Sequence, residues 1–211
     1  MKVKILILLM LATILISCGS VPIERQYYII DYNPVPANPQ LILTTPLPYR
    51  VQVPDSRVSR VYDRSQVVFR YSSHRIEYSA IDLWAVRLSS AIPDVLTKHF
   101  LQYNTFAVTQ RDFLIERPDY EVISFINRVE LLKSDYYKAI YLDMDIFLRR
   151  GPDLAYIVRH SFNREYEVYT DDVEIFVQNL SRIIKEETDI FIEKVLIYFD
   201  VLPDNTSDIN Q

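Results

Sequence analysis

Three long segments in the second half of the chain alternate between apolar and polar residues, and they constrain the fold more than any other feature. They cover residues 120–132, 137–148 and 154–169. A period of two is typical of strands with one buried face, because successive side chains point to opposite sides of a sheet. Turn residues separate the segments at 134–135 and 151–153. The sequence therefore predicts an antiparallel meander with one face in water.

The alternation also indicates which side of the first two strands is buried. The even positions from 140 to 148 are apolar, and between residues 121 and 131 the odd positions carry more apolar residues than the even ones. We expect these two sets to face the core, because only one face of each strand packs against it.

Two segments repeat apolar residues at the three- and four-residue steps of an α-helix. The first covers residues 80–103 and follows Ser79, whose hydroxyl is placed to cap it. Pro93 is expected to kink or divide this helix, since proline has no N–H to donate. The second covers residues 172–198, with Asp171 as its cap. The predicted fold class is α+β, a mainly antiparallel sheet with two long amphipathic helices packed on one face.

Shorter strands are expected at residues 27–32, 49–53, 66–71 and 106–109, where β-branched and aromatic residues gather. Repeated prolines make residues 33–48 a loop, with at most a short strand at its centre, at Leu41–Thr44.

Three residues on the predicted helices have structural interpretations. Trp84 lies on the apolar face of the first helix and is expected in the core. His99 is interpreted as a packed histidine, and Glu187, which interrupts the apolar stripe of the second helix, as a paired edge residue.

The scarcity of glycine excludes several nucleotide-binding and hydrolase motifs. Gly19 and Gly151 are the only glycines in the chain. A phosphate-binding loop, a dinucleotide fingerprint and a Gly-x-Ser-x-Gly elbow each need glycines placed close together. The net charge of −5 argues against nucleic acid as a partner, because binding a phosphate backbone requires a basic face.

No residues form a recognisable catalytic or metal-binding pattern. A zinc site would require His74, His99 and His160 to converge with carboxylates. A Ser/His/Asp triad assembled from distant positions stays open, although nothing marks a nucleophile. Asp143 and Asp145 would act as an acid–base pair only beside another carboxyl group, and charge on a solvated sheet face is the simpler interpretation. We therefore expect a non-enzymatic protein without metal or cofactor.

The start of the chain has the parts of a secretory signal. Lys2 and Lys4 precede an apolar run of about a dozen residues, shorter than the ~20 that a permanent membrane-spanning helix needs. We expect the segment 1–17 to be removed from the mature protein.

The end of this segment, Leu15-Ile16-Ser17-Cys18, resembles a bacterial lipobox. Lipobox proteins are cleaved before the cysteine, whose thiol and amine are then acylated. The resemblance implies cleavage between Ser17 and Cys18 and attachment to the membrane through acylated Cys18. Gly19 stands where aspartate would signal retention in the inner membrane, which favours the outer membrane. The alternatives are a free cysteine in an ordinary signal peptide or in a membrane anchor.

Four segments follow from these observations: a lipoprotein signal peptide at 1–17, the acylated cysteine and a short tether at 18–26, a single α+β periplasmic domain at 27–200 and a disordered tail at 201–211. The eight residues after Cys18 reach at most about 28 Å, so the domain is expected close to its membrane.

Two stretches resemble the ABC-type transport auxiliary lipoproteins, which are the periplasmic partners of MCE-type lipid transport systems. Residues 54–71 are similar to that family's Pro…Tyr-Leu-Asp-Arg-Pro-Gln-Ile-Val segment, and residues 84–88 to the Trp-Ala…Leu start of its first helix. Val61 stands where the family has small or polar residues, and Ser65 replaces the proline.

The resemblance implies a lipid-anchored accessory subunit that docks or stabilises a transport conduit at the outer membrane. Its implied partners are an MCE-domain protein and an ABC permease and ATPase. Tyr62, Asp63 and Arg64 are candidates for partner contact. A structural role for this loop is equally open, with Asp63 capping the turn and Arg64 paired with a carboxylate.

A second class of function fits the same anchored domain: an envelope lipoprotein that regulates or scaffolds a peptidoglycan synthase or a secretion complex. An anchored hydrolase is a third interpretation. Strands 27–32 and 66–71 are candidates for edge-to-edge pairing in a homo-oligomer.

Overall fold

In the computed structural model of the protein, residues 24–203 are described, with the exception of residues 135 and 152. They form nine strands, two α-helices and a short 3₁₀ helix, η1. In chain order these elements are β1 (Gln26–Tyr28), η1 (Pro39–Leu41), β2 (Leu47–Gln52), β3 (Arg57–Val58), β4 (Gln66–Ser72), β5 (Arg75–Trp84), α2 (Leu88–Gln102), β6 (Phe106–Gln110), β7 (Tyr120–Lys133), β8 (Lys138–Arg150), β9 (Tyr156–Glu167) and α3 (Val173–Tyr198). The predicted signal segment and Cys18 lie outside the described residues.

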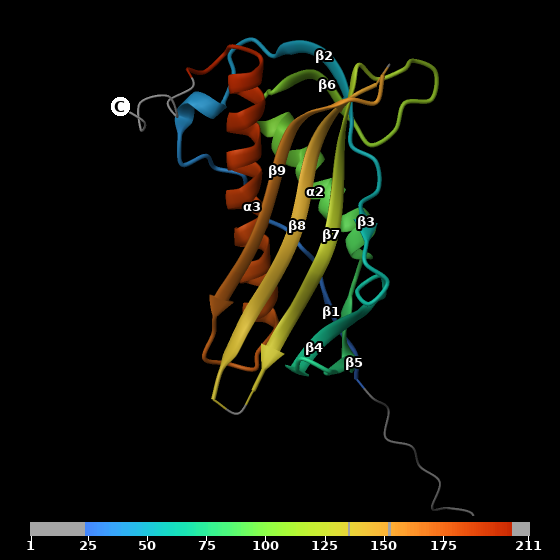
Figure 1. Cartoon of the computed structure of the whole chain (residues 1–211), viewed down its shortest axis with the longest axis vertical. Helices are drawn as coiled ribbons and strands as arrows, with labels where there is room; N and C mark the ends of the chain where they lie inside the picture. The colour runs from blue at the N-terminus through green and yellow to red at the C-terminus, as the bar shows by residue number, and fades with distance from the viewer. Residues whose placement is uncertain (1–23, 135, 152, 204–211) are drawn as a thin grey trace, which may run out of the picture.

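The sheet is organised around β7, which runs almost the full height of the domain (Figure 1). One edge of β7 pairs with β8 along its whole length, and β8 pairs with β9, both antiparallel. The other edge is shared by β2, β3 and β4, which all run parallel to β7. Beyond them, β6 pairs with β2, while β5 and β1 continue from β4. The meander predicted from the alternating segments is confirmed.

The α+β class is confirmed, but the sheet is mixed rather than mainly antiparallel. Three further strand pairings in the first half explain the difference. The β2–β6 and β1–β5 pairings are parallel, as are the pairings of β2, β3 and β4 with β7, and only β4–β5 is antiparallel. Alternation of side chains predicts a strand but carries no information about the direction of its neighbour.

The helices also differ from the prediction of two long helices on one face of the sheet. The 26-residue α3 lies along β8 and β9, whereas the 15-residue α2 packs against β3, β6 and α3.

The buried face of β7 changes side halfway along the strand. Val122 and Ile126 are buried in the first half, and Val129 and Leu131 in the second. The pairing with β8 shifts register between Ile126 and Arg128, which marks a β-bulge. One extra residue moves every following side chain to the other face. Before the bulge the odd position Ile123 is buried but lies outside the main core, so the odd positions face that core, as expected, only after the bulge. The even positions 140–148 of β8 are buried as predicted.

The helix predicted to begin after Ser79 begins only at Leu88, and Ser79 lies in β5. Its hydroxyl accepts the N–H of Asp82 at 2.9 Å, the bond expected of a helix cap, and donates to the Asp82 carboxylate at 2.7 Å. Here these bonds close a bulge, since the β4–β5 pairing steps from Val68–Tyr78 to Gln66–Leu83. Trp84 is buried as predicted, although it lies on this strand and not on a helix.

Pro93 lies inside α2 without ending it. A proline leaves the carbonyl four residues earlier without its helical donor. That carbonyl belongs to Ser89, and it accepts the backbone N–H of Ser56 at 2.8 Å. The segment before β3 thus replaces the bond that Pro93 cannot make.

The remaining elements agree with the prediction apart from local shifts. Strands β2, β4 and β6 are confirmed, but β1 is shorter than the expected 27–32, and the 3₁₀ helix η1 lies where a short strand at 41–44 was considered. Since β4 is paired on both edges, edge pairing by residues 66–71 in an oligomer is excluded by this fold. The cap of α3 is Asp172, which accepts the N–H of Glu174, and not Asp171.

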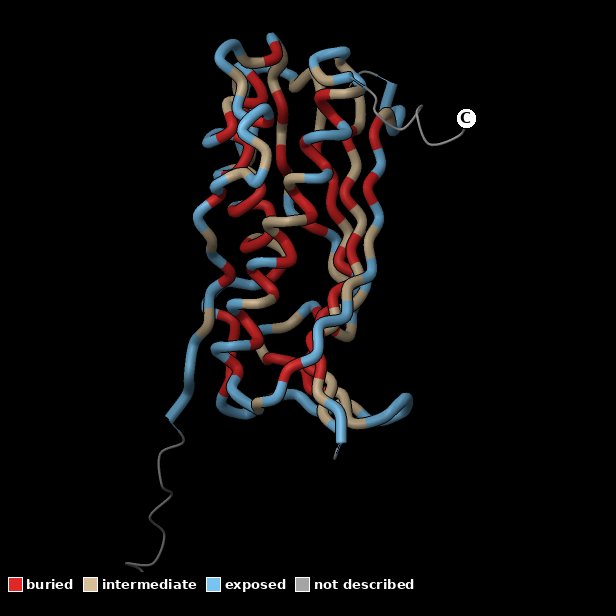
Figure 2. The backbone as a smooth tube through the Cα atoms, turned by 90° about the vertical axis from the view of Figure 1, so that its left-hand side faces the viewer, coloured by how far each residue is buried: buried red, intermediate tan, exposed pale blue. Residues whose placement is uncertain are grey.

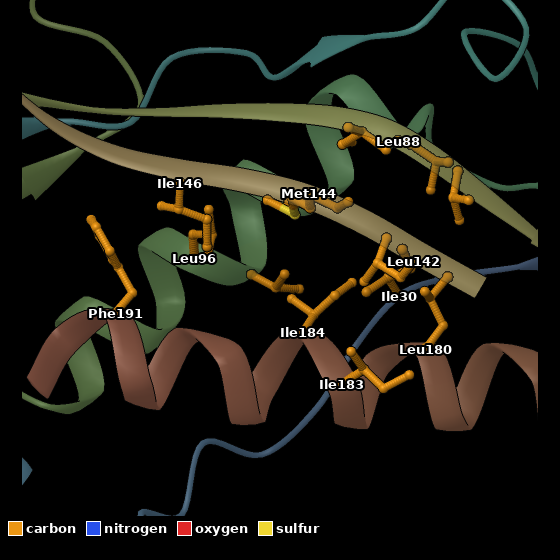
Figure 3. Packing of buried hydrophobic residues seen from close by; sticks show 14 of the residues in the cluster. Ile30, Leu88, Leu96, Leu142, Met144, Ile146, Leu180, Ile183, Ile184 and Phe191 are labelled. Atoms are coloured by element: carbon orange, nitrogen blue, oxygen red, sulfur yellow. The ribbon is translucent and has the colours of Figure 1, made fainter. Parts of the chain in front are cut away.

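The core lies between the sheet and the two helices. Figure 3 shows Leu96 of α2 and Ile184 and Phe191 of α3 packed near Met144 and Ile146 of β8. Buried residues extend along the strands and helices through the height of the domain, and exposed ones gather at its loops and ends (Figure 2). The fold is therefore a tall sandwich with distinct ends.

Candidate partner-contact site

The loop that carries Tyr62, Asp63 and Arg64 is fastened to β7 by its backbone. The N–H of Ser59 donates to the carbonyl of Ile126 at 2.9 Å. The carbonyl of Ser59 in turn accepts the N–H groups of Tyr62 and Asp63 at 2.8 and 3.0 Å. Backbone bonds therefore close the turn, and the side chain of Asp63 is exposed.

Tyr62 is buried and donates from its hydroxyl to Glu130 at 2.6 Å. Glu130 lies on β7 and is 0% exposed. Its carboxylate also accepts from Nε of Arg70 and Nε of Arg128, each at 2.5 Å. A carboxylate removed from water is strongly destabilising unless it is matched by cations and donors. Burial, with the bond to Glu130, raises the pKa of Tyr62 to about 12, so its phenol remains a donor.

Arg64 does not form the expected carboxylate pair within the described residues. Its guanidinium lies over the ring of Tyr78 on β5, 3.6 Å from the ring centroid, and its Nε is buried without a hydrogen-bond partner there. A cation over an aromatic face is an established stabilising arrangement. The structure thus brings Tyr62 and Arg64 into packing with β7 and β5, and Asp63 is left as the member of the motif that faces solvent. Partner contact at this loop stays a prediction.

Sequence reasoning missed Glu130, Arg70 and Arg128 as the partners of Tyr62. The available signal was a charged residue at position 130 between the apolar residues Val129 and Leu131. Glu130 lies 68 positions from Tyr62, so nothing local links the two.

A second carboxylate, the half-buried Asp189 on α3, links α3 to α2 and to the residue that follows it, Tyr103. It accepts from Nε2 of His99 at 2.9 Å, the hydroxyl of Tyr103 at 2.6 Å and Nζ of Lys185 at 3.0 Å. Burial alone would raise the pKa of Asp189, but these bonds hold it below its usual value. Because Nε2 donates, Nδ1 of His99 accepts the Tyr32 hydroxyl at 3.2 Å. Burial lowers the pKa of His99, which is therefore a packed, neutral histidine as predicted.

Glu187 joins α3 to β9. It is 3% exposed and pairs with Nε2 of His160 at 2.7 Å and with Arg164 at 2.5 Å. Burial alone would raise the pKa of Glu187, whereas His160 and Arg164 hold it below its usual value. The expected pairing of Glu187 is confirmed, at a buried rather than an edge position. His99 and His160 thus belong to separate pairs, and no metal-holding group of three acidic, cysteine or histidine residues occurs in the described part of the chain.

Asp143 and Asp145 share the outer face of β8. The side-chain amide of Asn127, the residue at the β7 bulge, donates to both carboxylates at 3.0 and 2.9 Å. Burial alone would raise the pKa of Asp145, but bonds from Ser161 and Asn127 and the charge of Arg159 hold it below its usual value. The pair is bridged by an amide donor and is suited to hold two negative charges, which agrees with charge on a solvated sheet face.

The predicted lipidation site, Cys18 with Ser17 before it, lies outside the described residues, so acylation stays a prediction. No helix within residues 24–203 is both long and apolar enough to cross a membrane.

Residues 32–189 match the family described as "ABC-type transport auxiliary lipoprotein component". The chain therefore belongs to this family of transport auxiliary lipoproteins. The protein is therefore an auxiliary, membrane-associated component of an ABC-type transport system in the cell envelope, of a family that is not one of enzymes.

Solved structures support the fold. A protein from Xanthomonas campestris superimposes with a TM-score of 0.67 at 14% identity, over 83% of this chain and 97% of that one. An uncharacterized protein gives a TM-score of 0.62 at 15% identity, over 82% of this chain and 99% of that one. At these identities the likeness concerns the fold alone. No curated protein matches the sequence.

We expect Tyr62→Phe to lower the free energy of unfolding by about 1.5–3 kcal/mol, because it removes a hydrogen bond to a buried charge. Chemical denaturation measures this. Tyr27→Phe is the matched control, since Tyr27 is 62% exposed. Equal stability of Tyr62→Phe and Tyr27→Phe would show that Glu130 does not depend on the phenol.

We expect the free energy of unfolding to fall as the pH drops below about 6.5, the pKa of an exposed histidine. Burial lowers the pKa of folded His99, so below that pH the unfolded chain binds a proton that the folded chain does not. The loss continues until the pH reaches the folded pKa. Replacing His99 by glutamine should flatten the dependence in denaturation curves measured across this range. The exposed His74 provides the control His74→Gln, and a slope unchanged in His99→Gln would contradict the assignment.

Proposed function

We propose that this protein is a lipid-anchored periplasmic accessory subunit of an MCE-type lipid transport system, and that it docks or stabilises the conduit at the outer membrane. Membership of the auxiliary lipoprotein family over residues 32–189 carries this proposal. The lipobox-like sequence ending at Cys18 supplies the anchor, with two or three acyl chains giving stable attachment. An ABC permease and ATPase supply the energy, and an MCE-domain protein forms the conduit.

The domain has two ends that suit an adaptor. β7 has 14 residues and spans about 45 Å at the usual rise of a strand. The chain enters through β1 on the side of the β4–β5 and β7–β8 turns, and the loop 111–119 between β6 and β7 lies at the opposite end (Figure 1). A subunit anchored at its first residues therefore presents loop 111–119 away from its membrane.

This distal loop has an apolar tip. Leu114 and Ile115 are 94% and 96% exposed, and Leu154 in the turn between β8 and β9, at the same end, is 55% exposed. Large apolar side chains grouped in water commonly mark interaction sites. We assign the contact with the conduit subunit to this tip.

Cys18→Ala should release the protein from outer-membrane fractions without unfolding it, because the core residues of the domain lie between Ile30 and Leu196. Membrane fractionation with immunodetection measures the distribution, and thermal unfolding checks the fold. Persistent sedimentation of the folded variant with the outer membrane would refute attachment through acylated Cys18.

Affinity capture from solubilised membranes should recover the MCE-domain protein and the permease and ATPase. The double variant Leu114→Asp and Ile115→Asp should lose this capture and keep its thermal stability, since both side chains are exposed. Leu101→Asp, at a 56% exposed position on α2, is the control and should keep the capture. Recovery of peptidoglycan synthases in place of transport subunits would favour the scaffold alternative.

A further inference from the structure

A cleft of about 530 Å³ opens at the end of the domain where β4 and β7 terminate. Three cationic side chains line it: Arg70 from β4, and Arg128 and Lys133 from β7. Tyr71 and Tyr137 also contribute, and Tyr137 is 41% exposed. The cleft therefore combines positive charge with aromatic surface.

The positive charge in this cleft is only partly neutralised. Arg70 and Arg128 share a single carboxylate, Glu130, which is buried beneath them. Lys133 lies 3.7 Å from Asp171, but that carboxylate is also bound by Lys138 at 3.0 Å. A cluster of this kind, with guanidinium groups held in place by a buried anion, is suited to bind a further anion.

The cleft lies on the side of the domain at which the chain enters. Tyr71 and Lys133 also line an adjacent hollow together with Gln26, the first residue of β1. Gln26 is the eighth residue after Cys18, and eight residues reach at most about 28 Å when extended. An acylated Cys18 thus holds this cleft within reach of the lipid headgroups.

The surrounding tyrosines fit the same location. Tyr136, next to the cleft in the turn after β7, is 99% exposed, and Tyr169, in the connection from β9 to α3 at the same end (Figure 1), is 88% exposed. Tyrosine rings are enriched where one side of a surface is apolar and the other is wet, as at the boundary of a bilayer.

We propose that this cleft binds the phosphate of an anionic phospholipid headgroup in the membrane that carries the protein. Arg70, Arg128 and Lys133 hold the phosphate, and the tyrosines contact the glycerol and upper acyl region. The inference rests on the lipid anchor of the proposed function and adds a second, specific contact with the membrane.

The test uses the full acylated protein in nanodiscs of phosphatidylcholine, with or without phosphatidylglycerol. Amine acetylation read by mass spectrometry reports the accessibility of each lysine. Lys133 should react severalfold more slowly in nanodiscs that contain phosphatidylglycerol. Lys98, which is on α2 and 48% exposed, is the internal control and should react equally in both.

A charge variant separates binding in the cleft from shielding by the bilayer. Ser73 is exposed at the rim, and its side chain makes no hydrogen bond within the described structure. Ser73→Asp places a carboxylate there without removing a contact and should abolish the protection of Lys133. Protection of Lys133 that survives in Ser73→Asp refutes phosphate binding in the cleft. Equal reactivity of Lys133 with and without phosphatidylglycerol refutes it as well.

Further outcomes distinguish lipid phosphate from free phosphate, and failure of the lipid anchor from failure of the headgroup site. Equal protection by inorganic phosphate, added to the protein in detergent micelles, shows that free phosphate is the ligand and refutes the lipid assignment. Protein that fails to co-elute with nanodiscs refutes the anchor and this inference with it. Co-elution without protection refutes the headgroup site alone and leaves the anchor and the transport role standing.

Discussion

A carboxylate without access to water has to be matched by donors and cations, and Glu130 imposes this requirement where the two halves of the chain meet. Its partners are Tyr62 from the loop after β3, Arg70 from β4 and Arg128 from β7 itself. One edge of β7 pairs along its whole length with β8. The other edge pairs with β2, β3 and β4, each over only two positions. Strand pairings of two positions define the register weakly. The hydrogen bonds to Glu130 therefore help to fix the positions of β4 and of the loop after β3 against β7.

The second half of the fold was predictable from the sequence because its information is local. The three alternating segments join through short turns, and antiparallel pairing of neighbours follows. The topology of the first half was not predictable in this way, since β2, β3 and β4 pair with β7, which lies far along the chain. The bulge in β7 was hidden for a related reason: each half of the strand has a clear pattern, but a single pattern was fitted to both. At Ser79 the local signal was real, and the hydroxyl makes the bond of a helix cap inside a bulged strand, where pairing with β4 outweighs helix propensity.

The functional features also divide into those with a local sequence signal and those formed by residues far apart in the chain. The lipobox-like sequence and the segment around Tyr62 are each contiguous in sequence, so the family could be inferred from them, and the match over residues 32–189 confirms the family. The chemistry around Tyr62 required the structure, because Glu130 is 68 positions away. The same holds for Asp189 and Glu187: sequence identified a packed His99 and a paired Glu187, but their partners lie at separations of 90 and 27 positions. Buried polar clusters formed between distant elements leave no local period to detect.

With the proposed lipid anchor, a weak intrinsic affinity of the cleft for a headgroup is sufficient. Two contacts joined by a short linker act at an effective concentration in the millimolar range, so a site that would bind a free headgroup poorly is still occupied at the membrane. On the proposed function, acylated Cys18 alone would limit the distance of the domain from the bilayer but leave its orientation free. The proposed second contact at Arg70, Arg128 and Lys133 would restrict that orientation, because these residues lie at one end of β7, a strand about 45 Å long. In this proposed arrangement the long axis would point away from the membrane and hold Leu114 and Ile115 where a conduit approaching from the periplasm would meet them.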